Sequence, residues 1–190
     1  MFENLREATK RLVSPVAKTL VKLGLTANQV TLLGLVFSFL YLVLLYFNFY
    51  LIAVAFLVSS ALMDAFDGEV ARMRGTSGPA GAFIDSNLDR IEDLVYLLGF
   101  LVLGYPPLAV SITIGSALIT SYVRAKAEAL GQVMRGRGII ERGDRLLFIF
   151  LILIVGSFQK TVAIYIFYVF TLLSAITVIQ RIFIGYKAIR

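Results

Sequence analysis

The sequence contains no cysteine and no histidine among its 190 residues. Without cysteine, the chain can form neither a disulfide nor a thiolate metal site. Without histidine, it lacks the usual general base and the commonest metal ligand of proteins. Any acid–base or metal chemistry must therefore use carboxylates, lysine, arginine or tyrosine.

Charge is also missing from long stretches of the chain. Residues 23–63 are 41 consecutive uncharged residues, and residues 94–123, 146–159 and 161–180 are uncharged as well. Hydrophobic residues make up 59% of the sequence, against about 45–50% in a soluble domain. Because a bilayer core needs about 20 apolar residues per helix, these stretches predict membrane spans rather than the buried helices of a soluble protein.

Glycine, proline and charged residues separate the apolar stretches into six segments. We predict an all-α integral membrane protein with six transmembrane helices, preceded by an amphipathic juxtamembrane helix. The expected spans are residues 29–46, 50–73, 81–103, 108–130, 144–155 and 161–186. We expect a juxtamembrane segment over residues 1–28 and a single catalytic transmembrane domain over residues 29–190.

The first residues are too charged for a secretory signal peptide. They favour a basic helix lying on the membrane surface. Such a helix could close over a site or simply attach the chain to anionic lipid, and the sequence leaves both interpretations open.

The charged residues are distributed unequally across the predicted membrane. Six spans place both termini on one side, together with 17 of the 18 basic residues, and only Lys160 falls on the other side. The positive-inside rule makes the first side cytoplasmic. All 12 acidic residues fall there too, which the rule does not explain, since acidic residues contribute little to orientation. We therefore expect a multi-pass protein of the cell membrane whose active site faces the cytoplasm.

Four aspartates lie where the second predicted span ends and the third begins. Asp64 and Asp67 are three residues apart, and Asp85 and Asp89 are four apart, so each pair shares a helix face. The short connection makes the two helices antiparallel neighbours, which brings the pairs to the same depth. Burial and mutual repulsion oppose ionisation of all four, and charges at membrane depth usually mark function. Two Mg²⁺ or Mn²⁺ ions would balance them.

An alternative is that nearby arginines neutralise these aspartates as ion pairs. The arginines concerned are Arg72, Arg74 and Arg90. Two glycines, Gly68 and Gly81, flank the aspartates, and each allows either close approach of a ligand to the backbone or tight helix packing.

Residues 64–89 combine these features into one pattern. They read Asp64-x-x-Asp67-Gly68-x-x-Ala71-Arg72, eight further residues, then Gly81-x-x-x-Asp85-x-x-x-Asp89. This resembles the signature of the CDP-alcohol phosphotransferase family at all eight defining positions. The resemblance covers nearly the whole chain. It implies transfer of a phosphatidyl or archaetidyl group from a CDP-linked lipid, CDP-diacylglycerol or CDP-archaeol, to a polar alcohol, with release of CMP. It also implies a homodimer in the bilayer, and we expect no nucleic-acid partner.

The resemblance implies a role for each matching residue. Asp64, Asp67 and Asp85 would bind metal, and Asp89 would bind metal and also act as general base on the attacking hydroxyl. The nucleotide would contact Asn28, Thr31, Gly68, Ala71, Arg72, Ser77 and Gly81, with Arg72 on the pyrophosphate. The run from Gly24 to Thr31 is similar to the family's Gly-Leu-Thr-Pro-Asn-x-x-Thr, with Ala27 in place of proline.

Five basic residues form a second candidate site, for an acceptor phosphate. They are Arg124, Lys126, Arg142, Arg145 and Arg181. Arginine forks suit a phosphate dianion, and Arg181 follows 20 uncharged residues. This region is similar to the family branch that makes phosphatidylinositol phosphate, or its archaeal ether-lipid counterpart, from inositol 1-phosphate. The resemblance implies that Lys126, Arg142 and Arg181 hold the phosphate of the acceptor.

Three alternatives stay open at this point. The acceptor could be glycerol 3-phosphate or serine, and the cations could be ordinary positive-inside residues. In a different class of function, intramembrane carboxylates also build divalent-cation transporters. Transporters more often place their acids near mid-bilayer with access from both sides, so the one-sided distribution favours an enzyme.

Overall fold

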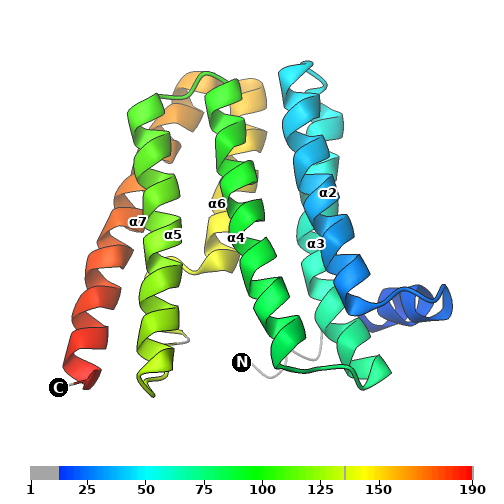
Figure 1. Ribbon diagram of the computed structural model, residues 1–190. Coiled ribbons are helices and arrows are strands. Elements are labelled where there is room, and N and C mark those ends of the chain that lie inside the picture. Colours follow the sequence, from blue (N-terminus) through cyan, green and yellow to red (C-terminus); the bar gives the residue numbers. More distant parts are fainter. Residues whose placement is uncertain (1–12, 135, 190) are drawn as a thin grey trace. The chain divides into compact units, whose positions relative to one another are not determined.

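The computed structural model describes residues 13–134 and 136–189. Within them the regular secondary structure is entirely helical (Figure 1). A helical segment over residues 13–22 precedes helices α2 (Ala27–Tyr46), α3 (Tyr50–Arg74), α4 (Pro79–Val102), α5 (Pro107–Ala129), α6 (Arg142–Phe158) and α7 (Lys160–Ile189). The all-α prediction is confirmed, and every predicted span begins and ends within three residues of an observed helix.

Helices α2, α3, α5 and α7 are long and apolar enough to cross a membrane. The predicted class, an all-helical membrane protein, is therefore confirmed. The other two predicted spans differ from these four for physical reasons. Helix α6 has only 17 residues, and α4 contains five charged side chains in the 24 residues of the helix.

Local sequence signals fix the helix ends around the aspartates. Thr26 caps α2: Gln29 donates its backbone N–H to Thr26 Oγ1 at 3.3 Å, and Thr26 donates its own to Gln29 Oε1 at 2.9 Å. Helix α3 ends at Gly75, whose φ of 64° is the left-handed conformation that glycine adopts easily. Pro79 then begins α4, where its missing N–H costs no helical hydrogen bond. The connection between α3 and α4 is thus kept short.

The first compact unit is built on the pairing of α2 with α3. Ser60 on α3 donates to the Gly34 carbonyl on α2 at 2.6 Å. The segment over residues 13–22 joins this unit through Ala17, which is fully buried against Val30, Phe66 and Val70. This agrees with a helix in the predicted juxtamembrane segment, whose residues 1–12 lie outside the described residues.

The second compact unit is built on α7, against which α5 and α6 both pack. Thr113 and Thr171 share a buried hydrogen bond of 2.9 Å between α5 and α7. Phe100, Tyr105 and Phe167 form an aromatic cluster with ring centroids 4.8–5.3 Å apart. The two units divide between Val95 and Tyr96, inside α4, and a single catalytic domain over residues 29–190 stays a prediction.

Candidate active site

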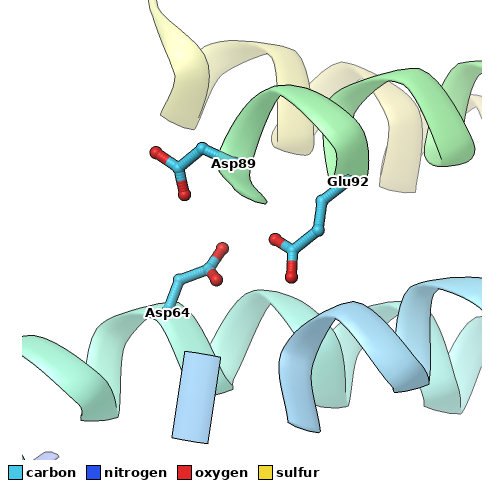
Figure 2. Close-up of side chains that lie close together, drawn as sticks. All are labelled: Asp64, Asp89 and Glu92. Atoms are coloured by element: carbon cyan, nitrogen blue, oxygen red, sulfur yellow. The ribbon is translucent and has the colours of Figure 1, made fainter. Parts of the chain in front are cut away.

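Three carboxylates from two helices meet in the first unit. Asp64 extends from α3, and Asp89 and Glu92 extend from α4 toward it (Figure 2). One oxygen of each lies within 4.8 Å of the others. Glu92 is fully buried, whereas Asp64 and Asp89 are partly exposed. Carboxylate oxygens are the ligands that Mg²⁺ and Mn²⁺ prefer, so the chemistry of this donor set fits the predicted divalent cation.

Glu92 was missed in the sequence analysis, which counted it only among the acidic residues. The available signal was its spacing, because a residue three positions after Asp89 shares the same helix face. The structure also accommodates it specifically. A Cβ added to Gly34 on α2 would lie 3.0 Å from Glu92 Oε1 and 3.1 Å from the Cβ of Met63. Glycine at position 34 thus leaves the room that the Glu92 carboxylate occupies.

The other two predicted metal ligands lie close to this cluster. Asp67 is 6% exposed, and Thr31 donates its hydroxyl to Asp67 Oδ2 at 2.7 Å. The negative charges of Asp85 and Asp64 both act on the Asp67 carboxylate. Of the arginines considered as neutralising partners, Arg90 pairs with Asp89 at 3.1 Å. The four aspartates therefore share one electrostatic neighbourhood, and their roles as ligands stay a prediction.

Beside these carboxylates lies a cavity of about 570 Å³. Small-molecule sites usually measure about 300–1,000 Å³. Asp67 and Asp85 line it, together with six of the seven residues predicted to contact the nucleotide, which are Asn28, Thr31, Gly68, Ala71, Ser77 and Gly81.

The two glycines of the motif face this cavity rather than another helix. A Cβ on Gly68 would meet nothing within 4 Å, and one on Gly81 would meet only Asn28 Oδ1 at 4.0 Å. Tight helix packing therefore does not explain either glycine. Exposed backbone in a cavity is what close approach of a ligand requires.

The seventh predicted residue, Arg72, is not among the residues that line this cavity. Its guanidinium pairs with Glu69 at 2.6 Å, and its side chain is 67% exposed. Arg74 lines the cavity in its place and donates to the Val21 carbonyl of the 13–22 segment at 3.4 Å. Spacing alone does not separate the two arginines, because Arg74 lies three residues after the cavity-lining Ala71 and Arg72 lies four residues after the cavity-lining Gly68. The ion pair with Glu69 is what the structure shows to distinguish Arg72.

The predicted acceptor residues lie in the second unit. Arg145 and Arg181 are each 4% exposed, and the positive charges of Arg124 and Arg145 act on Arg181. Arg124 itself is exposed and pairs with Glu128 at 2.9 Å. Lys126 is exposed and Arg142 is partly buried. Three of the five cations, Arg124, Arg145 and Arg181, thus share one electrostatic neighbourhood.

Comparison with known proteins decides the family. Residues 24–186 match the family model described as CDP-alcohol phosphatidyltransferase. The chain belongs to this family. It is therefore a membrane-embedded transferase of phospholipid biosynthesis, and nothing in the comparisons supports the transporter alternative.

Named relatives of this CDP-alcohol phosphatidyltransferase include two archaeal enzymes. It is 43% identical over 122 residues to the archaetidylinositol phosphate synthase of Aeropyrum pernix, covering 64% of this chain and 63% of that one. It is 33% identical over 184 residues to the archaetidylinositol phosphate synthase of Pyrococcus horikoshii, covering 96% and 95%.

Solved structures of Mycobacterium tuberculosis phosphatidylinositol phosphate synthase are also similar, at 28% identity. The complex with CDP-DAG matches with a TM-score of 0.84 over 94% of this chain and 95% of that one. The complex with manganese and citrate matches with a TM-score of 0.84 over 93% and 90%.

Proposed function

We propose that this transferase moves a phosphatidyl or archaetidyl group from a CDP-linked lipid to inositol 1-phosphate and releases CMP. The observation that supports this most is the cavity of about 570 Å³ lined by the signature residues, with Asp67 and Asp85 in its wall. A relative of known structure was solved with CDP-DAG bound, and the named archaeal relatives are archaetidylinositol phosphate synthases.

The cavity suits the nucleotide part of the lipid donor. Its wall offers hydroxyl and amide groups from Asn28, Thr31 and Ser77 and open backbone at Gly68 and Gly81. Such a surface can bind a polar head group while the lipid tails stay in the bilayer. The pyrophosphate has two candidate cations at the end of α3: Arg72, from the family resemblance, and Arg74, from its position in the cavity wall.

In the proposed reaction, the hydroxyl oxygen of the acceptor attacks the β-phosphorus of the CDP-lipid. One P–O bond forms, the bond from the β-phosphorus to CMP breaks, and the Asp89 carboxylate takes the hydroxyl proton. Asp64, Asp67, Asp85 and Asp89 would hold the cation, with Glu92 as an additional ligand. Bound Mg²⁺ or Mn²⁺, in our proposal two ions, would stabilise the negative charge that develops on the phosphate oxygens.

We propose that Arg124, Lys126, Arg142, Arg145 and Arg181 bind the phosphate of the acceptor. The support is that the positive charges of Arg124 and Arg145 act on the buried Arg181 guanidinium, since arginine groups gathered in this way suit a phosphate dianion as the bound anion. Inositol 1-phosphate supplies that anion, whereas serine and free inositol do not. Glycerol 3-phosphate carries the same group and is the nearest rival.

An assay of CMP release tests the function. Purified enzyme receives CDP-lipid and Mg²⁺ or Mn²⁺ with inositol 1-phosphate, glycerol 3-phosphate, serine or free inositol as acceptor. We expect inositol 1-phosphate to give the highest kcat/KM. A preference for glycerol 3-phosphate would support the proposed transfer reaction but contradict inositol 1-phosphate as the acceptor. Absence of CMP release with every alcohol would reject the transferase mechanism for this site.

We further propose that α4 and α6 complete six spans, with both termini and the aspartates on the cytoplasmic side and two chains forming a homodimer. The distribution of basic residues supports the orientation. Because the chain has no cysteine, single cysteines at Ser77 and at Val133, an exposed residue after α5, can be labelled with an impermeant maleimide in sealed vesicles of known orientation. We expect both to react from the same side, because α4 and α5 would cross the membrane in succession. Labelling from opposite sides would reject the six-span topology, and chemical crosslinking in the membrane tests the dimer.

A further inference from the structure

The guanidinium of Arg181 on α7 lies directly beneath the loop that precedes α6. A Cβ added to Gly138 in this loop would lie 2.7 Å from Arg181 Nε and 3.2 Å from Nη2. Real Cβ atoms do not approach other atoms so closely, so a side chain at position 138 would require the Arg181 guanidinium or the loop to shift. The Arg181 side chain is accordingly 5% exposed.

Hydrogen bonds hold this loop against α7. Ile139 donates its backbone N–H to Gln180 Oε1 at 3.1 Å, and Ile140 donates to Thr177 Oγ1 at 3.2 Å. Glu141 completes the arrangement, because its Oε1 accepts both the backbone N–H of Gly136 at 2.9 Å and Nη2 of Arg181 at 3.2 Å. One carboxylate oxygen therefore joins the start of the loop to the buried guanidinium.

Glu141 is also the N-cap residue of α6. Its backbone N–H donates to Asp144 Oδ2 at 2.9 Å. Serine, threonine, aspartate and asparagine are the favoured N-cap residues, so glutamate here departs from the local preference. The longer side chain is what allows the carboxylate to reach Arg181 and Gly136.

We propose that Glu141 is a positioning residue for the acceptor phosphate. Its carboxylate fixes the Arg181 guanidinium and closes residues 136–141 over it, so that the cationic group is already ordered when the acceptor arrives. A guanidinium offers five N–H donors, and the contacts with Glu141 and with the Thr120 carbonyl leave donors for a phosphate. This inference rests on the proposed role of Arg181 in acceptor binding.

The charges around Arg181 agree with this role. Arg124 and Arg145 add positive charge near it, and Glu141 and Glu128 add negative charge. Glu128 pairs with Arg124 on the exposed surface of α5 at 2.9 Å, whereas Glu141 pairs directly with Arg181 at 3.2 Å.

Steady-state kinetics of the full-length enzyme in lipid vesicles test the proposal, with CDP-lipid and inositol 1-phosphate varied separately. Glu141→Ser keeps a side-chain oxygen for capping α6 but is too short to reach Arg181. We expect it, like Glu141→Ala, to raise the KM for inositol 1-phosphate about tenfold, because a charge-assisted hydrogen bond is lost. The KM for CDP-lipid should stay within about twofold. Glu141→Gln keeps an accepting oxygen and should restore most of the affinity.

Lys187→Gln is the control, since it changes one charge at an exposed position on α7 that lies outside the proposed acceptor residues, and exposed charges contribute little. It should leave both KM values within about twofold. Gly138→Ala forces Arg181 to move by steric contact, so it should also raise the KM for inositol 1-phosphate while leaving that for CDP-lipid unchanged.

The possible failures are distinguishable. If Arg181→Ala raises the KM for inositol 1-phosphate and Glu141→Ser does not, Glu141 is not a positioning residue and the proposed acceptor site stands. If Arg181→Ala itself has no effect, the acceptor site is wrong. If Glu141→Gln lowers the KM, the carboxylate competes with the phosphate, and the positioning role is overturned.

Discussion

The two compact units place opposite charges on similar helical frameworks. In the first, Asp64, Asp89 and Glu92 meet within 4.8 Å beside an open cavity whose glycines present bare backbone. In the second, Arg145 and Arg181 are buried, and Arg181 lies beneath a loop that is hydrogen-bonded to α7. One unit concentrates negative charge around an open space, and the other concentrates positive charge under a closed loop.

The two units therefore require different partner charges in order to be stable and active. Buried like charges raise the free energy of the folded state unless an opposite charge accompanies them. Glu141 and the Thr120 carbonyl supply part of this for Arg181. In the acidic unit Arg90 pairs with Asp89 at 3.1 Å, and we propose that a divalent cation, which prefers oxygen ligands, balances the cluster of carboxylates. The acidic unit should thus respond to metal and to the CDP-lipid, and the basic unit to the acceptor.

The largest expected effect in this comparison is that of Asp89→Asn. The amide cannot accept the hydroxyl proton, so we expect kcat to fall by a factor of about 10³ or more, within the range of general-base catalysis. Binding of the CDP-lipid should be largely preserved, as measured by equilibrium binding of a labelled donor.

Asn87→Ala on the same helix is the control. Its side chain is exposed and donates to the Phe83 carbonyl at 2.7 Å, so both kinetic and binding constants should stay within about twofold, as for most surface substitutions. If Asp89→Asn lost donor binding as severely as turnover, Asp89 would be a structural or purely ligating residue.

Arg181→Ala should have the next largest effect and should act only on the acceptor. Loss of charge-assisted hydrogen bonds to a phosphate, about 1.5–3 kcal/mol, predicts a rise of roughly 10–100-fold in the KM for inositol 1-phosphate. The KM for CDP-lipid should not change. Because the Arg181 side chain is buried, thermal unfolding of each variant is measured as well, to separate a loss of binding from a loss of folding. Arg181→Lys is a second variant, which keeps the positive charge but lacks the planar guanidinium donors.

The matched control is Arg137→Ala, which removes a cation from an exposed loop position. Its acceptor KM should stay within about twofold. An equal rise for both variants would mean that general positive charge, rather than Arg181, attracts the acceptor.

Glu92→Gln tests whether the acidic cluster extends beyond the four aspartates of the motif. Replacing one carboxylate by an amide should weaken Mn²⁺ binding by about tenfold, the lower end of the range for changes close to a metal site. Isothermal titration of the purified protein with Mn²⁺ measures this without any assay of activity. Glu69→Gln, also buried but paired with Arg72 at 2.6 Å, should bind Mn²⁺ normally. Unchanged affinity in Glu92→Gln would exclude Glu92 from the metal site.

The helices could be predicted because their signals are local. Helices end or begin at residues such as Gly75 and Pro107 for stereochemical reasons. The aspartate pairs were equally accessible, since spacings of three and four residues place side chains on one face. The motif therefore indicated both the cavity wall and the two helices that contribute the carboxylates.

What the sequence did not reveal depends on neighbours distant in the chain. Glu92 has its place because Gly34 on another helix leaves room for it. Glu141 contacts Arg181, 40 residues away, through a loop whose path no local rule specifies. The places of Glu92 and Glu141 thus come from tertiary packing, which overrides local preference at functional positions. By contrast, the start of α6 two residues earlier than predicted is local, because Glu141 acts as N-cap with Asp144 three residues later.

The smallest effect in the comparison concerns the two arginines at the end of α3. Arg74 lines the cavity, whereas Arg72 is 67% exposed and paired with Glu69. We expect Arg74→Ala to raise the KM for CDP-lipid by about tenfold, the lower end for loss of one hydrogen bond to a charged group, and Arg72→Ala to raise it less, because exposed ion pairs contribute about 0–1 kcal/mol. Both variants should leave the KM for inositol 1-phosphate unchanged.

A larger effect of Arg72→Ala than of Arg74→Ala would identify Arg72 as the cation that binds the pyrophosphate, as the family resemblance implies. It would also mean that the Arg72–Glu69 pair opens when the donor binds, so that position on the helix face alone does not identify the cation that binds phosphate.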